Sequence, residues 1–268
     1  YITTGNPNLT PTEVYIFKLS NSFWYPVSQT NLWSSVTYKI SNNDILQSRN
    51  IQENGVTEDT YVQMNGTTNL NFNVWYSFML KKIGLECNPG LWMSFDNRFS
   101  LYNNQKVRTN NIWSSFNISF DKSIDSLLQS SLEFNLTWNQ GTSDNPNVAK
   151  TNNLNWKIST SQELQLPWKM KLKGEFDFNI IPSNAAFAGS QTYSLLNASI
   201  EKSLLHENAL TARLSVYDIL GQNRSISRSF YQNNISETIS QALTRYVMFT
   251  MIYKFKNKSK KNTDESQF

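Results

Sequence analysis

The sequence contains one cysteine, Cys87, and one histidine, His206, among its 268 residues. A single cysteine excludes an internal disulfide, and its apolar neighbours favour a small buried side chain over a reactive thiol. One histidine and one cysteine far apart in the chain cannot form a zinc-type cluster. His206 falls in an expected short turn, which favours a solvated residue over a member of a Ser-His-Asp triad. A glycine-rich phosphate loop is also missing, so we expect no enzyme, no metal and no cofactor.

Charged residues are scarce, at 16%, where soluble domains usually have about a quarter. Asn, Ser, Thr and Gln replace them, and aromatic residues reach 13%, which argues against disorder. No run approaches the roughly 20 apolar residues of a membrane-spanning helix. A transmembrane β-barrel needs no such run, because its strands alternate apolar and polar residues. Part of the net charge of +4 lies in the last stretch, from Lys254 to Lys261, so we expect a solvated basic tail and no nucleic-acid partner.

Alternation with a period of two runs through almost the whole chain. In residues 69–80, the side chains from Leu70 to Leu80 at even positions are apolar, whereas Asn69, Asn71, Asn73 and Ser77 share the other face. Residues 130–139 and 169–180 repeat the pattern, with Phe134 and Phe176 on their apolar faces. Each segment has about the length that a tilted strand needs to cross a bilayer.

The pattern predicts eleven successive strands, near residues 12–25, 32–48, 60–80, 84–102, 107–120, 127–140, 152–165, 169–181, 192–203, 209–219 and 239–256. Short turns are expected near residues 26–31, 81–83, 121–126, 166–168 and 204–208. Longer polar loops are expected near residues 49–59, 103–106, 141–151, 182–191 and 221–238. Outer-membrane barrels sort their connections in this way, with the short turns in the periplasm. Pro89 and Gly174 lie inside strands and suggest local bulges or bends, and Pro89 predicts the loss of a ladder hydrogen bond.

Tryptophans occur near the predicted strand ends. Because indole rings favour both membrane interfaces, we expect two aromatic girdles. The members would be Trp24, Trp33 and Trp168 by the short turns and Trp113, Trp138 and Trp156 by the loops. The alternative is the core of a soluble β-sandwich binding module. The apolar faces are too large and too regular for one shared core.

Motifs near the two ends of the chain carry a resemblance to known proteins. Residues 5–13, Gly-Asn-Pro-Asn-Leu-Thr-Pro-Thr-Glu, resemble a segment that precedes a mid-barrel strand of TonB-dependent receptors. Residues 217–223 and 245–249 are similar to the closing strands of receptor-like outer-membrane β-barrel proteins. The ending of Tyr253 and Phe255 resembles the last-strand signal read by the barrel-assembly machinery. The polar tail after Phe255 departs from the family, which usually ends near that aromatic residue.

The resemblance implies a 22-stranded barrel with an amino-terminal plug. We therefore expect an all-β, transmembrane antiparallel up-and-down β-barrel of about eleven strands, the carboxy-terminal half of such a barrel, in the bacterial outer membrane. Residues 1–256 would form the barrel segment, and 257–268 a disordered polar basic tail. The implied partners are outer-membrane lipid, the remainder of the barrel and its plug, TonB and a surface lipoprotein.

The polar face would then line the barrel interior. Its charged members are candidates for contact with ligand or plug: Asp96, Arg98, Glu133, Lys157, Lys171, Lys173, Glu175, Asp177 and Arg213. The carboxylates Glu175 and Asp177 share a face as a glycosidase pair might, but Lys171 and Lys173 lie beside them and favour a mutually neutralised wall. The expected function is TonB-dependent uptake of a nutrient. The alternative is a non-transporting structural or docking barrel for surface or secretion proteins.

Overall fold

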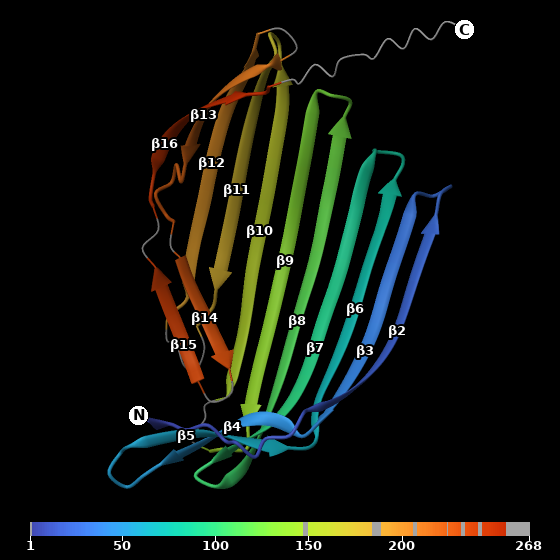
Figure 1. The fold of residues 1–268 in the computed structure, drawn as a ribbon. Helices are drawn as coiled ribbons and strands as arrows, with labels where there is room; N and C mark the ends of the chain where they lie inside the picture. The colour runs from blue at the N-terminus through green and yellow to red at the C-terminus, as the bar shows by residue number, and fades with distance from the viewer. Residues whose placement is uncertain are drawn as a thin grey trace, which may run out of the picture.

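The computed structural model describes residues 2–146, 150–183, 189–205, 208–223, 225–231, 234–240 and 243–255. The expected basic tail and His206 lie outside them. Eleven antiparallel strands form the wall of one curved sheet (Figure 1). They are β2 (Glu13–Tyr25), β3 (Thr30–Asn42), β6 (Thr67–Leu80), β7 (Leu85–Tyr102), β8 (Gln105–Ile124), β9 (Leu128–Ser143), β10 (Thr151–Leu166), β11 (Met170–Ile181), β12 (Gln191–Leu204), β13 (Leu210–Tyr217) and β16 (Tyr246–Tyr253). The predicted number of wall strands is confirmed.

Two of the predicted strands were drawn too long, because the chain leaves the wall at Asn43 and rejoins it at Gly66. Both residues have positive φ, 51° and 93°, a conformation that Asn and Gly tolerate best. Between them lies a hairpin of β4 (Asp44–Ile51) and β5 (Thr57–Met64), which is flanked by β1 (Ile2–Thr3). This hairpin lies across the loop end of the sheet, where β4 pairs in parallel with the end of β7 (Figure 1).

Two further connections differ from the expectation. Residues 103–106 form no loop, because Asn103 and Asn104, with φ of 48° and 60°, make a two-residue turn between β7 and β8. The long connection near 221–238 contains a separate hairpin of β14 (Ser225–Tyr231) and β15 (Asn234–Ser240). The last wall strand therefore begins at Tyr246 and not near residue 239.

The register follows the predicted alternation. Phe72 pairs with Val36 and Met93, and the next residue, Asn73, pairs with Ser35 and Trp92. We call the side of the sheet that carries Phe72 the apolar face and the side that carries Asn73 the polar face. Each strand keeps the same division because cross-strand partners point to the same side. No second sheet packs on the apolar face within the described part of the chain, which argues against the β-sandwich.

The expected girdles are only partly correct. Trp138 and Trp156 lie on the apolar face, opposite Ser114 and Leu136, and Trp168 lies in the turn between β10 and β11. Trp24, Trp33 and Trp113 lie instead on the polar face, in phase with Ser35 and Ser94. Their nearness to strand ends suggested an interface, but the face of a strand residue is decided by its phase.

Pro89 and Gly174 produce no bulge. The register of β6 with β7 is the same on both sides of Pro89, from Trp75–Gly90 to Phe78–Cys87, but the ladder is interrupted between these pairs. The predicted local loss of a ladder bond is confirmed. Gly174 pairs in register with Gln162 and Ala198, so the expected bulge at that position is wrong. Cys87 is 2% exposed, as its neighbours predicted.

Candidate functional site on the polar face

The polar face of strands β10 to β13 carries a continuous row of charged side chains. Strand β11 places Lys171, Lys173, Glu175 and Asp177 on this face because they occur at every second position. In the register, Lys171 pairs with Glu201 of β12, which in turn pairs with Arg213 of β13. Opposite charges thus meet directly across neighbouring strands, where cross-strand pairs interact most strongly.

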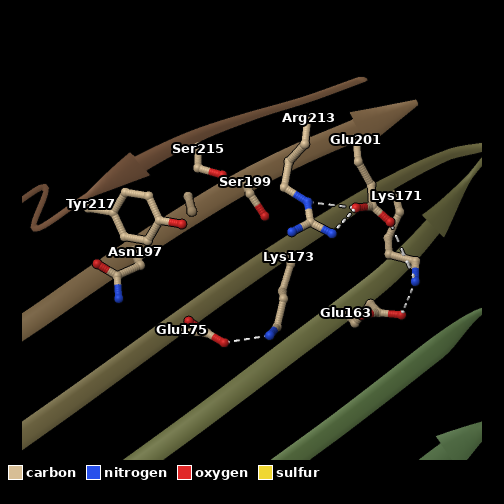
Figure 2. A pocket seen from close by; sticks show the side chains of 11 residues that line it. Glu163, Lys171, Lys173, Glu175, Asn197, Ser199, Glu201, Arg213, Ser215 and Tyr217 are labelled. Carbon is tan, nitrogen blue, oxygen red and sulfur yellow. Dashed lines mark hydrogen bonds and ion pairs between the residues drawn. The ribbon is translucent and has the colours of Figure 1, made fainter. Parts of the chain in front are cut away.

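The ion pairs form one branched network and one isolated pair (Figure 2). Lys171 Nζ lies 2.8 Å from Glu163 Oε1 and 3.7 Å from Glu201 Oε1. Arg213 donates from Nε and Nη2 to Glu201 Oε2, at 2.8 and 2.7 Å. Lys173 pairs along its own strand with Glu175, at 2.5 Å. Glu201 therefore binds two cations, whereas Glu175 binds one.

These side chains line a groove of about 320 Å³ (Figure 2). Its remaining wall is uncharged and polar, with Asn197, Ser199, Ser215 and Tyr217. Lys173 and Glu175 are 41% and 45% exposed. A groove of this kind can bind a polar surface or ligand through paired charges and hydroxyl groups, but its ion pairs leave no single uncompensated charge.

Two further hollows lie on the same face. One of about 330 Å³ contains Glu133, Lys157 and Asp177, with Lys157 Nζ 3.3 Å from Asp177 Oδ2. The other, about 360 Å³, lies near the loop end and contains Asp96 and Arg98, with Arg98 Nη2 3.7 Å from Asp96 Oδ1. Asp96 also accepts a hydrogen bond of 2.8 Å from Asn69.

The residues that the structure describes contain no cluster of His, Cys, Asp and Glu suited to a metal ion. They also contain no helix long and apolar enough to cross a membrane.

Residues 107–253 match the outer membrane protein beta-barrel family. The match covers more than half of the 268 residues. The chain belongs to this family. No curated protein matches the chain. Membership places the protein in the bacterial outer membrane, so the apolar face is the lipid face and the polar face lines the barrel lumen.

All nine predicted lumen residues lie on the polar face of the outer-membrane sheet. The structure brings Lys171, Lys173, Glu175 and Arg213 into the first groove, and Glu133, Lys157 and Asp177 into the second. Asp96 and Arg98 lie apart from them, on β7.

Sequence reasoning missed Glu163 and Glu201, which complete the network. The alternation could have identified both, since Glu163 is in phase with Lys157 on β10 and Glu201 with Asn197 on β12.

The two residues of the predicted assembly signal lie at the end of the barrel wall. Tyr253 is the last residue of β16, where it pairs with Leu210 on the lipid face. Its ring contacts that of Phe255 edge to face, with centroids 4.7 Å apart. Phe255 is 89% exposed. The backbone amide of Lys254 donates to the carbonyl of Ala209, so the end of β16 lies on the short-turn side, which in this family is the periplasmic side.

Proposed function

We propose that this chain forms half of the wall of a TonB-dependent receptor, which takes up a nutrient across the outer membrane. The observation that carries the proposal is an open sheet of membrane-spanning strands. Within the described residues, β2 bonds only to β3 along the wall, and β16 only to β13. Both edge strands run toward the short turns. Eleven is half of the 22 strands of plugged outer-membrane transporters.

Physical chemistry favours completion of this sheet by further strands. Backbone groups that face lipid without a partner cost several kcal/mol each, so a barrel wall in the membrane must close. Two edge strands of the same direction cannot pair with each other in an antiparallel barrel. Strands beyond this sequence would therefore pair with the free edges of β2 and β16.

The charged side chains of the lumen wall favour a wide, water-filled interior. The charged side chains of the first groove are between 19% and 45% exposed, and they pair with one another along the wall. We infer that in the whole protein this wall contacts a plug, which a periplasmic energy-transducing protein displaces. Neutralised charges permit such a plug to move, because no contact leaves an isolated buried charge behind.

The test is an uptake measurement in the native bacterium. The gene that encodes the whole protein would be deleted, and accumulation of a panel of labelled nutrients measured with and without a protonophore. We expect the deletion to abolish the protonophore-sensitive accumulation of at least one nutrient, and the wild-type gene to restore it. Unchanged accumulation of every nutrient, together with loss of surface proteins from the deletion strain, would favour the docking barrel.

A further inference from the structure

Five of the eight tryptophans of the chain lie on the lumen face of five adjacent strands. Trp33 of β3 pairs directly with Trp75 of β6. Trp75 pairs in turn with Gly90 of β7, and the indole of Trp92 lies over the α-carbon of that glycine. We call the set the tryptophan row: Trp24, Trp33, Trp75, Trp92 and Trp113.

The row is continuous across the wall. Trp24 pairs with Asn31, two residues from Trp33, and Trp92 pairs with Ser115, two residues from Trp113. Diagonal neighbours of this kind remain within reach of aromatic side chains. With about 4.8 Å between neighbouring strands, the row spans roughly 20 Å. That length suits an extended chain molecule better than a single small ring.

The residues paired with the row are uncharged, and the nearest charges on this face are Glu86 and Asp96, which accept hydrogen bonds from Ser77 and Ser94. Every residue paired with one of these tryptophans is Asn, Ser, Gly or another Trp: Ser22, Asn31, Asn73, Gly90, Ser94, Ser115 and Asn139. The same-face residues two positions away on each strand are also Asn, Ser or Gly. The charged network on β10 to β13 has no counterpart among these paired residues.

Gly90 has a defined place in the row. A Cβ at this position would lie 2.3 Å from the indole of Trp92, which any side chain at Gly90 would displace. The glycine therefore leaves room for the Trp92 indole directly beside its α-carbon, next to Trp75 in the register. Trp33 and Trp113 are 37% and 40% exposed, so these two indoles are open to the polar side of the sheet.

We propose that the tryptophan row binds an uncharged oligosaccharide. The C–H groups on the flat faces of a sugar ring carry partial positive charge and are attracted to the negative face of an indole. Amide and hydroxyl side chains between the indoles can exchange hydrogen bonds with sugar hydroxyl groups. A phosphate or carboxylate ligand would need cations, and a purely apolar ligand would not need the amides.

The proposal names a substrate class for the uptake function and rests on that function for its biological meaning, but not for its test. Binding would be measured by calorimetry on the whole detergent-solubilised protein with maltohexaose, cellohexaose and mannohexaose. Trigalacturonate would serve as the charged comparison. We expect at least one neutral sugar to bind and trigalacturonate not to bind.

Single substitutions test whether the sugar binds at the tryptophan row. Each of Trp33→Ala and Trp75→Ala should weaken sugar binding about three- to tenfold, and Trp75→Phe should retain most of it. Two controls on the lipid face should bind normally: Trp138→Ala and Trp156→Ala. Heat-modified gel mobility would show that each variant is folded.

Absence of binding by all three neutral sugars would overturn the inference, as would equal losses in Trp75→Ala and Trp156→Ala. Protonophore-sensitive uptake of a nutrient other than a sugar, without sugar binding, would refute this inference alone and leave the proposed uptake function standing.

Discussion

At the scale of single residues, the phase of a residue along its strand determines whether its side chain faces lipid or the lumen. The nine charged residues were assigned to the lumen by counting alternate positions, and the structure places all of them on the polar face. Trp24 and Trp33 were assigned by residue type and nearness to strand ends, and their face was wrong. An indole suits a membrane interface, but it suits a ligand-binding lumen wall equally well. Composition cannot separate these two environments, whereas the register can.

Phe72 and Asn71 offer a direct test of the two faces. Phe72→Arg should cost about 2–4 kcal/mol of folding free energy, because it places a cation between Val36 and Met93 on the lipid face. Asn71→Arg should cost far less, since its partners Thr37 and Ser94 face water. Denaturant titration of the protein in lipid vesicles measures both. Equal penalties would mean that the alternation does not divide lipid from lumen.

The charged network predicts unequal roles for two glutamates on the lumen wall. Glu201→Gln weakens contacts to Lys171 and Arg213 together and should cost about 1 kcal/mol. Glu175→Gln removes only a well-exposed pair with Lys173 and should leave stability nearly unchanged. The same vesicle titration compares them. A larger loss for Glu175→Gln would contradict the assignment of Glu201 as the centre of the network.

At the scale of elements, periodicity predicted every wall strand but not where the chain leaves the wall. Val62 and Met64 of β5 are in phase with Leu70 of β6, so the alternation does not mark that break. The break after β3 is marked only by the short polar run from Ser41 to Asp44. The break depends on backbone conformation at Asn43 and Gly66, which periodicity does not report. The β14–β15 hairpin was missed for a similar reason, since its polar sequence reads as a loop.

The β4–β5 hairpin is held by a buried ion pair, which gives a prediction at this scale. Asp59 is 2% exposed and accepts hydrogen bonds of 2.8 and 2.9 Å from Arg49 and one of 2.6 Å from Gln47. Asp59→Asn should destabilise the hairpin by about 2 kcal/mol, because it leaves the Arg49 charge poorly compensated. Hydrogen exchange should accelerate in β4 and β5 and stay unchanged in β8. Glu53→Gln at the exposed hairpin tip is the matched control. If Glu53→Gln also accelerated hydrogen exchange in β4 and β5, the assignment of Asp59 would be contradicted.

At the scale of the whole molecule, the register of the described residues defines a wall with two free edges. Antiparallel pairing alternates direction, so the first and last of eleven strands run the same way. Sequence reasoning reached this result from the strand count, although three strand boundaries were wrong by several residues. The predicted number of wall strands was still correct, because the errors lay at the loop end. The hairpins β4–β5 and β14–β15 are inserted there and do not change the number of wall strands.

Disulfide trapping tests whether β2 and β16 meet in the whole protein. In a Cys87→Ala background, Ser20→Cys with Ser35→Cys is the positive control, since these residues are register partners in β2 and β3. Partners in neighbouring strands have α-carbons about 4.5–5.5 Å apart, within the range of a disulfide. Ser20→Cys with Thr250→Cys places one thiol on each edge strand, both in lumen phase. We expect rapid oxidation of the control pair and none between the edge strands. A disulfide between positions 20 and 250 would show that the two edges pair, and would replace the half-barrel with a small barrel that closes on itself.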